Sequence, residues 1–146
     1  MNLKLFFLSF LCTICILFST VKICEAQSTK ADLLIGDWTD SNKETLVHCY
    51  KQNGKYYGKT TWIENLADRG KPLPKNQQYW INMVVMKDFE FNVADNEWAN
   101  GTIYQPRTDK TYTAFVKLKD KNTLQVTGYV WFRFLSESEI FTRVNN

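Results

Sequence analysis

The feature that most constrains this chain is the alternation of apolar and polar residues in short segments. It is clearest in residues 111–119, where every second side chain from Tyr112 to Leu118 is apolar or aromatic. A repeat of two residues places successive side chains on opposite faces of a β-strand. Signals typical of helices are nearly absent after the first 26 residues. We therefore expect an all-β protein.

Turn residues divide the chain into eight or nine such segments. Asn53-Gly54 is a pair that strongly favours a two-residue β-hairpin turn. Pro106 should end a strand, because proline has no N–H group to donate to a β-ladder. The expected strands are residues 33–39, 44–52, 55–64, 79–86, 89–91, 98–104, 111–119, 124–133 and 140–144.

The number and length of these strands favour a closed sheet. A small β-protein avoids exposed strand edges by closing on itself. We expect a single antiparallel up-and-down β-barrel of about eight strands, with a β-sandwich as the alternative. A barrel of this size has an interior that side chains fill or that holds one small ligand. The polar residues 65–78 form the longest expected loop, which is either a binding loop or an unstructured connection.

The first 26 residues have the layout of a secretory signal peptide. Lys4 precedes an apolar run of about 17 residues, and Cys24-Glu25-Ala26 places small residues at the −3 and −1 positions of a cleavage site. We expect residues 1–26 to be removed and residues 27–146 to form one barrel domain, exported to the periplasm or secreted. The alternative is an uncleaved anchor, because the run is close to the shortest that spans a bilayer.

Cleavage would leave Cys49 as the only cysteine, so the domain would have no internal disulfide. The net charge of the remaining chain is about +2, with both signs mixed along it. That pattern argues against a nucleic-acid partner and against a basic membrane-binding patch. We expect a monomer with no membrane span after cleavage.

Two positions resemble the lipocalin and calycin barrels. Gly36-Asp37-Trp38 is similar to their Gly-x-Trp signature, and Arg143 is similar to the arginine that packs over that tryptophan. An arginine over an indole ring is stabilised by roughly 0.5–2 kcal/mol. The resemblance implies a structural latch in which Arg143 on the last strand holds Trp38 on the first.

A second resemblance covers residues 33–144. The chain is similar to a family of exported bacterial proteins called domain of unknown function 2147, which implies a small barrel behind a signal peptide and no established activity. The matching segments are Gly36-Asp37-Trp38, residues 54–59, Trp98, residues 100–104 with Pro106, residues 110–112, residues 124–130 and residues 140–144.

The chain departs from this family at several polar or glycine positions. The resemblance places aspartate at Gln105, glycine at Asp109, arginine at Thr127 and glycine at Trp131. It also places a Gly-Arg pair at residues 136–137, where Ser136 and Glu137 stand. If the family has a common polar ligand, these departures imply that this member binds it weakly or binds a different ligand.

Residues for catalysis or for binding a metal ion are scarce. His48 is the only histidine, and its neighbour Cys49 should point to the opposite face of the strand. A metal site needs several convergent ligands, and no such spacing is present. Asp37 and Asp40 are interpreted as strand-end and turn residues. We expect no enzyme activity, no cofactor and no metal; a hydrolase that uses Glu64 and Asp68 is the least favoured hypothesis.

Amphipathic aromatic residues are more informative, because such side chains line pockets for small apolar or sugar-like ligands. We expect a small hydrophobic or amphipathic ligand of the cell envelope; filling of the core is the alternative role of these rings. A structural or interaction module with Tyr129, Trp131 and Arg133 as its contact face is the alternative function. The expected ligand-binding residues are Tyr57, Trp62, Trp80, Tyr104, Tyr112 and Tyr129.

Overall fold

The computed structural model describes residues 30–64, 80–131, 133 and 136–144. The chain divides into two compact units, Met1–Asp32 and Leu33–Asn146. The second unit holds all of the described β-strands. The expected signal peptide and the loop at residues 65–78 lie outside the described residues. In the part of the chain that is described, no helix is long and apolar enough to cross a membrane.

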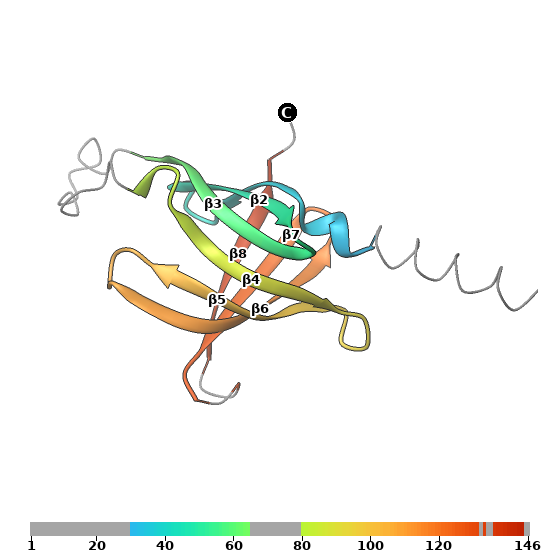
Figure 1. Ribbon diagram of the computed structural model, residues 1–146. Helices are drawn as coiled ribbons and strands as arrows, with labels where there is room; N and C mark the ends of the chain where they lie inside the picture. The colour runs from blue at the N-terminus through green and yellow to red at the C-terminus, as the bar shows by residue number, and fades with distance from the viewer. Residues whose placement is uncertain (1–29, 65–79, 132, 134–135, 145–146) are drawn as a thin grey trace, which may run out of the picture. The chain divides into compact units, whose positions relative to one another are not determined.

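Eight antiparallel strands form a closed barrel, as the alternation predicted (Figure 1). Each strand pairs with the next one in the sequence, and β8 pairs with β1 to close the sheet. A short 3-10 helix, η1, precedes β1. The bounds are η1 Asp32–Leu34, β1 Gly36–Asp40, β2 Thr45–Gln52, β3 Lys55–Ile63, β4 Val84–Asn92, β5 Glu97–Gln105, β6 Lys110–Asp120, β7 Thr123–Tyr129 and β8 Ser136–Arg143.

The register of β6 and β7 shows why the alternating residues matter. Val116 pairs with Val126, and Leu118 pairs with Leu124. Because opposed residues share a face, the apolar sets of both strands point into the barrel together. Val116, Val126 and Leu124 are buried. A slip by one residue would turn all of them outward.

The predicted hairpin turn is present. Asn53 and Gly54 both have positive φ angles, 51° and 80°, and connect β2 to β3 with Gln52 opposite Lys55. Pro106 directly follows the last residue of β5, Gln105, as expected.

Four predicted strand boundaries are wrong. The first strand was predicted from residue 33, but Leu33 and Leu34 belong to η1, so β1 begins at Gly36. Residues 80–82 form a turn, so β4 begins at Val84 and continues through residues 89–91 as one strand. Strand β7 ends at Tyr129, because Trp131 takes a positive φ of 66° that breaks the ladder. Strand β8 begins four residues earlier than predicted, at Ser136.

A β-bulge shapes the wall of the barrel at β5. Asn100 has a φ of 61°, and the pairing of β5 with β6 shifts register between Trp98 and Gly101. A Cβ atom on Gly101 would lie 2.4 Å from the Phe89 ring, which is fully buried on β4. Gly101 therefore leaves the space in which Phe89 packs against β5.

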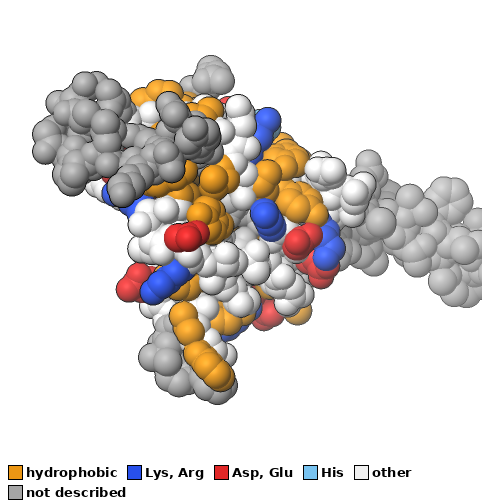
Figure 2. Space-filling model, turned by 60° about the vertical axis from the view of Figure 1, so that its left-hand side comes forward, with side chains coloured by type: hydrophobic (Ala, Val, Ile, Leu, Met, Phe, Trp, Pro, Cys, Tyr) orange, Lys and Arg blue, Asp and Glu red, His pale blue; other side chains and the backbone are white. Residues whose placement is uncertain are grey.

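In a meander of this kind, alternate connections lie at the same end of the barrel. One end of the barrel, called the mouth below, holds the β1–β2, β3–β4, β5–β6 and β7–β8 connections. The β2–β3, β4–β5 and β6–β7 turns lie at the other end with the start of β1 and the end of β8, which is called the floor below. Figure 2 shows lysine, arginine and acidic side chains mixed on the face in view.

Candidate functional site

The floor of the barrel is held by Trp38 and Arg143, the pair that the sequence resemblance implies. The two residues are opposite each other in the β1–β8 pairing, and the Arg143 guanidinium lies 4.1 Å from the centre of the Trp38 ring. The Trp38 indole N–H donates to the carbonyl of Leu34, 2.9 Å away. The tryptophan therefore joins the segment before β1 to the last strand.

The rest of the guanidinium binds backbone carbonyls at the floor. Arg143 donates to the carbonyl groups of Ile35 at 2.9 Å, Lys121 at 3.0 Å, and Leu33. A Cβ atom on Gly36 would lie 2.7 Å from one guanidinium nitrogen, and Gly36 has a φ of 132° that favours glycine. Glycine before the tryptophan thus makes room for the arginine.

Above this floor lies a cavity of about 250 Å³ inside the barrel. The lower part of its wall is mainly apolar and comes from both halves of the chain. Most of its residues alternate along their strands, since inward-facing positions recur every second residue. The apolar strand residues around the cavity are Trp38, Val47, Cys49, Ile63, Val85, Met86, Ile103, Leu124, Val126 and Phe141.

Cys49 contributes a thiol to this wall. The side chain is fully buried, and its Sγ atom lies 4.0 Å from the Met86 Sδ atom. Burial raises the pKa of the Cys49 thiol to about 12, an effect that Arg143 partly opposes. The group is a protonated thiol at neutral pH and behaves as a small apolar side chain. Its neighbour His48 points to the opposite face of β2, as predicted, and lies on the outside of the barrel, where its Nδ1 atom is 2.8 Å from Asp37 Oδ1.

The mouth of the cavity holds its charged residues. Asp40, at the end of β1, is buried, and its Oδ1 atom accepts hydrogen bonds from the backbone N–H groups of Glu44 at 2.7 Å and Thr45 at 3.3 Å. Asp40 therefore stabilises the turn after β1, as expected for a turn residue, and it also lines the cavity.

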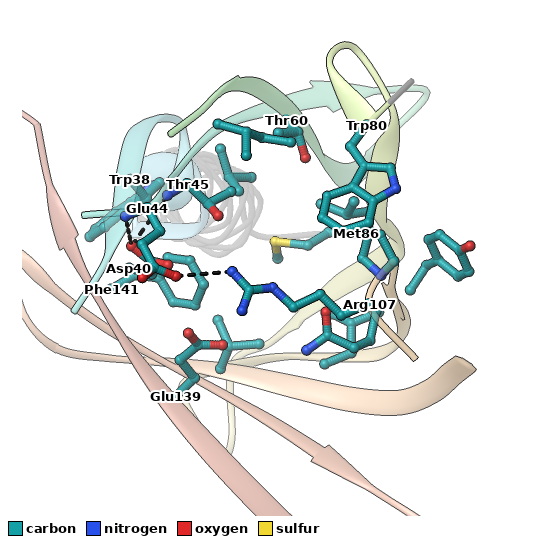
Figure 3. A pocket seen from close by; sticks show the side chains of 18 of the residues that line it. Trp38, Asp40, Glu44, Thr45, Thr60, Trp80, Met86, Arg107, Glu139 and Phe141 are labelled. Carbon is teal, nitrogen blue, oxygen red and sulfur yellow. Dashed lines mark hydrogen bonds and ion pairs between the residues drawn. The ribbon is translucent and has the colours of Figure 1, made fainter. Parts of the chain in front are cut away.

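An ion pair crosses this mouth. Arg107 in the β5–β6 connection donates to the Oε2 atom of Glu44 in the β1–β2 connection at 2.9 Å. The Glu44 side chain is 4% exposed and the Arg107 side chain 47% exposed. In Figure 3, Arg107 reaches over Met86 toward Glu44, with Trp80 on the far side of the cavity. The pair thus connects two loops that are distant in the sequence.

Glu139 on β8 is the third carboxyl group of the mouth. Glu139 is exposed on one side, and its partial burial on the cavity side raises its pKa. The nearby Asp40 carboxylate raises the pKa further, and Arg107 partly opposes both effects. Figure 3 shows the Glu139 carboxyl group turned toward the Arg107 guanidinium. Strand β1 has already ended at Asp40, opposite Phe141, so residues 136–140 of β8 pair only with β7. Glu139 therefore faces both the cavity and solvent.

Of the six aromatic residues predicted to bind a ligand, the structure brings two to this cavity, Trp80 and Tyr104. Tyr57 lies on the outer wall, where its hydroxyl donates to Asp88 at 2.8 Å, and Trp62 is 47% exposed. Tyr112 and Tyr129 line a separate, shallower depression beside Trp131. The cavity itself is built by aliphatic and sulfur-containing side chains more than by these rings.

Sequence reasoning missed the polar residues of the mouth, Glu44, Arg107 and Glu139. One signal was available for Glu139, because it alternates with Phe141 on β8. The strand was predicted to begin at residue 140, so that alternation was not used. Glu44 and Arg107 lie in or beside turns, where no alternation reports which way a side chain points.

The comparison with protein families decides what this barrel is related to. The profile of a family described as "Uncharacterized protein conserved in bacteria (DUF2147)" matches residues 36–143. The chain belongs to the DUF2147 family. The match spans the strands from β1 to β8, including Trp38 and Arg143 of the floor and the three carboxyl groups of the mouth.

A solved structure adds the fold relationship for this DUF2147 member. The chain is similar to protein HP1028 from Helicobacter pylori, which is described as belonging to the lipocalin family. The TM-score is 0.58 at 18% sequence identity, covering 77% of this chain and 84% of that chain. No curated protein sequence matches the chain. The expected lipocalin-like fold is confirmed.

The structure also explains two of the departures that the DUF2147 resemblance implied. Asp109 and Trp131 stand where glycine is expected, and both have positive φ angles, 55° and 66°. Glycine adopts such angles at the lowest steric cost. The Asp109 carboxylate accepts a hydrogen bond from the Tyr104 hydroxyl at 2.9 Å, a local contact that glycine at this position could not make.

Proposed function

We propose that this DUF2147 member is a non-enzymatic binding protein that holds a small amphipathic molecule inside its barrel. The observation that supports this function best is the cavity of about 250 Å³, apolar toward the floor and polar at the mouth. Pockets with apolar walls and a few placed polar groups are typical of small-molecule sites. The lipocalin-like fold is compatible with such a role.

The size of the cavity limits the ligand. A water molecule occupies about 30 Å³ of liquid volume, so the cavity holds a molecule of roughly eight non-hydrogen atoms. An aliphatic chain or one ring fits this space, with a polar head group at the mouth. Burial of an apolar chain contributes about 0.8 kcal/mol for each methylene group removed from water. Affinity for such a ligand therefore comes mainly from the apolar wall.

We further propose that the protein is exported, cleaved after Ala26, and monomeric in the cell envelope. The signal-peptide layout of residues 1–26 supports export. N-terminal sequencing of the protein recovered from the periplasm or the medium should begin at Gln27, and light scattering should give the mass of one chain. An intact N-terminus in the membrane fraction would contradict cleavage.

The test of binding is native mass spectrometry of protein purified without detergent, followed by extraction of any bound compound. The expected result is one bound small molecule per chain. Val126→Phe should abolish its retention, because the larger ring fills the cavity from β7. Val93→Phe is the matched control, since Val93 is 51% exposed in the β4–β5 turn. Equal retention by both variants would place the ligand outside the barrel.

One observation favours a second function, the interaction module. Trp131 is 87% exposed beside the exposed Val130, and large exposed apolar groups mark contact sites. Arg133 was predicted to belong to the same contact face, but its side chain folds back over Phe115 and binds Glu97 on the outer wall of the barrel. If Trp131 anchors a partner, Trp131→Ser should abolish pull-down of that partner from envelope extracts without lowering the melting temperature. Unchanged pull-down would exclude this role.

A further inference from the structure

We propose that Glu139, in the mouth of the cavity, selects ligands that carry a protonated amine. This inference rests on the proposed function, because it specifies the head group of the molecule that the barrel holds. Three observations support it: the charge balance of the mouth, the position of Arg107, and the opening beside β8.

The charge balance of the described cavity residues leaves two of the three carboxylates, Asp40 and Glu139, without a counter-ion. Among the described residues that line the cavity, Asp40, Glu44 and Glu139 are acidic, and Arg107 is the one cation. Asp40 accepts two backbone N–H groups of the β1–β2 turn, and Glu44 binds Arg107. Within the same set, Glu139 has no hydrogen-bond partner. A carboxylate in this position favours a cation that approaches from the cavity.

Arg107 shows that the acidic side of the mouth already holds a cation. Its guanidinium reaches Glu44 across the mouth, at the boundary between the buried carboxylate and solvent. The alkyl part of an amine ligand would lie on the apolar wall below, and its ammonium group would lie against the Glu139 carboxylate, on the side away from the Arg107 guanidinium. Because an ammonium group donates hydrogen bonds and accepts none, it fits a carboxylate better than it fits the guanidinium.

The missing strand partner of β8 gives the amine an approach. Residues 136–140 pair with β7 alone, so the Glu139 side chain is exposed on the side where β1 has ended. The pKa of Glu139 is raised by burial and by Asp40, which is the response of a carboxyl group that lacks a full counter-ion. An ammonium group at hydrogen-bond distance would lower that pKa.

An anionic head group fits this mouth less well. A carboxylate ligand would meet three resident carboxyl groups and one arginine that is already paired. Like charges within a few ångströms destabilise each other strongly where solvent is partly excluded. A fatty acid would therefore have to share the Arg107 guanidinium with Glu44 and would add a fourth negative charge to the mouth.

Three probes with the same eight-carbon chain test the inference: octylamine, octanol and octanoate. Isothermal titration calorimetry of the cleaved protein at pH 7.5 should show octylamine binding at least about tenfold more tightly than octanol, and octanoate binding most weakly. In Glu139→Gln, octylamine should bind as weakly as octanol, while octanol affinity stays unchanged and reports an intact cavity. Glu90→Gln, which removes an outer-wall carboxylate bound to Lys55, is the matched control and should keep the preference for the amine.

The outcomes separate the two proposals. Octanol binding without any preference for octylamine, or a preference that survives in Glu139→Gln, would overturn the role of Glu139 and leave the proposed function standing. Failure of all three probes to bind would overturn the proposed function and, with it, this inference.

Discussion

At the scale of single residues, Glu139 should lower the stability of the empty protein. Its folded-state pKa is raised above the ordinary value of 4.5 by burial and by Asp40, with Arg107 opposing. The native state then binds a proton more tightly than the unfolded state, so this residue lowers the free energy of unfolding as pH rises above 4.5. Glu44 also faces this group, but it is paired with Arg107.

Glu139→Gln should therefore raise the melting temperature at pH 7, and the gain should disappear at pH values below 4. Thermal unfolding of both proteins across this range measures the difference. A gain in stability from removing a binding residue is common, because binding sites are rarely optimised for stability. A lower melting temperature for Glu139→Gln at pH 7 would show that the carboxylate is a structural group.

A second residue-scale prediction concerns the floor. Arg143→Ala removes the contact with the Trp38 ring and the bonds to three carbonyl groups, so we expect a loss of roughly 2–4 kcal/mol in the free energy of unfolding. Urea denaturation provides this value. Arg143→Lys keeps the charge but lacks the planar guanidinium group with its several N–H donors, so it should recover only part of the lost stability. Full recovery by lysine would mean that the charge alone matters.

At the scale of elements, the β5 bulge should tolerate no side chain at Gly101. A methyl group there would overlap the buried Phe89 ring. Gly101→Ala should cost roughly 1–3 kcal/mol, the usual range for overpacking a core. Thr113→Ala, an exposed change on the paired strand β6, should stay within about 0.5 kcal/mol of the parent protein. Chemical denaturation of both variants tests this, and equal stability would show that Phe89 can move aside.

The β7–β8 connection is held to the barrel wall by a buried carboxylate. Glu97 is fully buried and lies 2.7 Å from Arg133 and 3.2 Å from Lys117. Burial raises the pKa of Glu97, but its bonds to Arg133 and Lys117 outweigh that effect and the net pKa is lowered. The ionised Glu97 carboxylate therefore stabilises the fold at pH values above its ordinary pKa of 4.5. This contribution is lost as the pH falls through the lowered pKa that Glu97 has in the folded protein.

Arg133→Ala should thus cost roughly 1–3 kcal/mol at pH 7, because it leaves Glu97 with Lys117 alone. The variant should also lose less stability than the parent protein when pH is lowered from 5 to 3. Urea denaturation at the two pH values measures both effects. If the deficit of the variant is the same at both pH values, Arg133 acts through its contact with the Phe115 ring and not through Glu97.

Strand existence could be predicted at this scale because period-two alternation reports directly which side chains share a face. Strand ends could not, because they depend on backbone angles. Asp88 adopts a φ of 61° within β4, which lets the chain continue through two segments that looked separate. Trp131 also has a positive φ, but there the strand stops, and β7 ends at Tyr129. Tryptophan is not a typical turn residue, so the sequence did not indicate this strand end.

At the scale of the whole molecule, the closed barrel and the Trp38–Arg143 pair could be predicted from the sequence, since both follow from alternation and from one pair of motifs. The cavity could not be predicted from the sequence. Whether a barrel is filled depends on the summed volumes of its inward side chains and on how they pack across the barrel, for example Met86 against the space left by Gly58, and this packing follows only from the register. The mouth was missed because loops bring Glu44 and Arg107 together across 63 residues.

The account depends on a ligand entering the barrel, and methyl NMR with octylamine tests that directly. Methyl signals of Val47, Leu124 and Val126, which line the cavity, should shift to saturation with one equivalent bound. Those of Val93 and Val130, which are exposed outside it, should not move. Shifts confined to the exposed valines, or no shift at millimolar octylamine, octanol and octanoate, would contradict the proposal that this barrel carries a small amphipathic molecule.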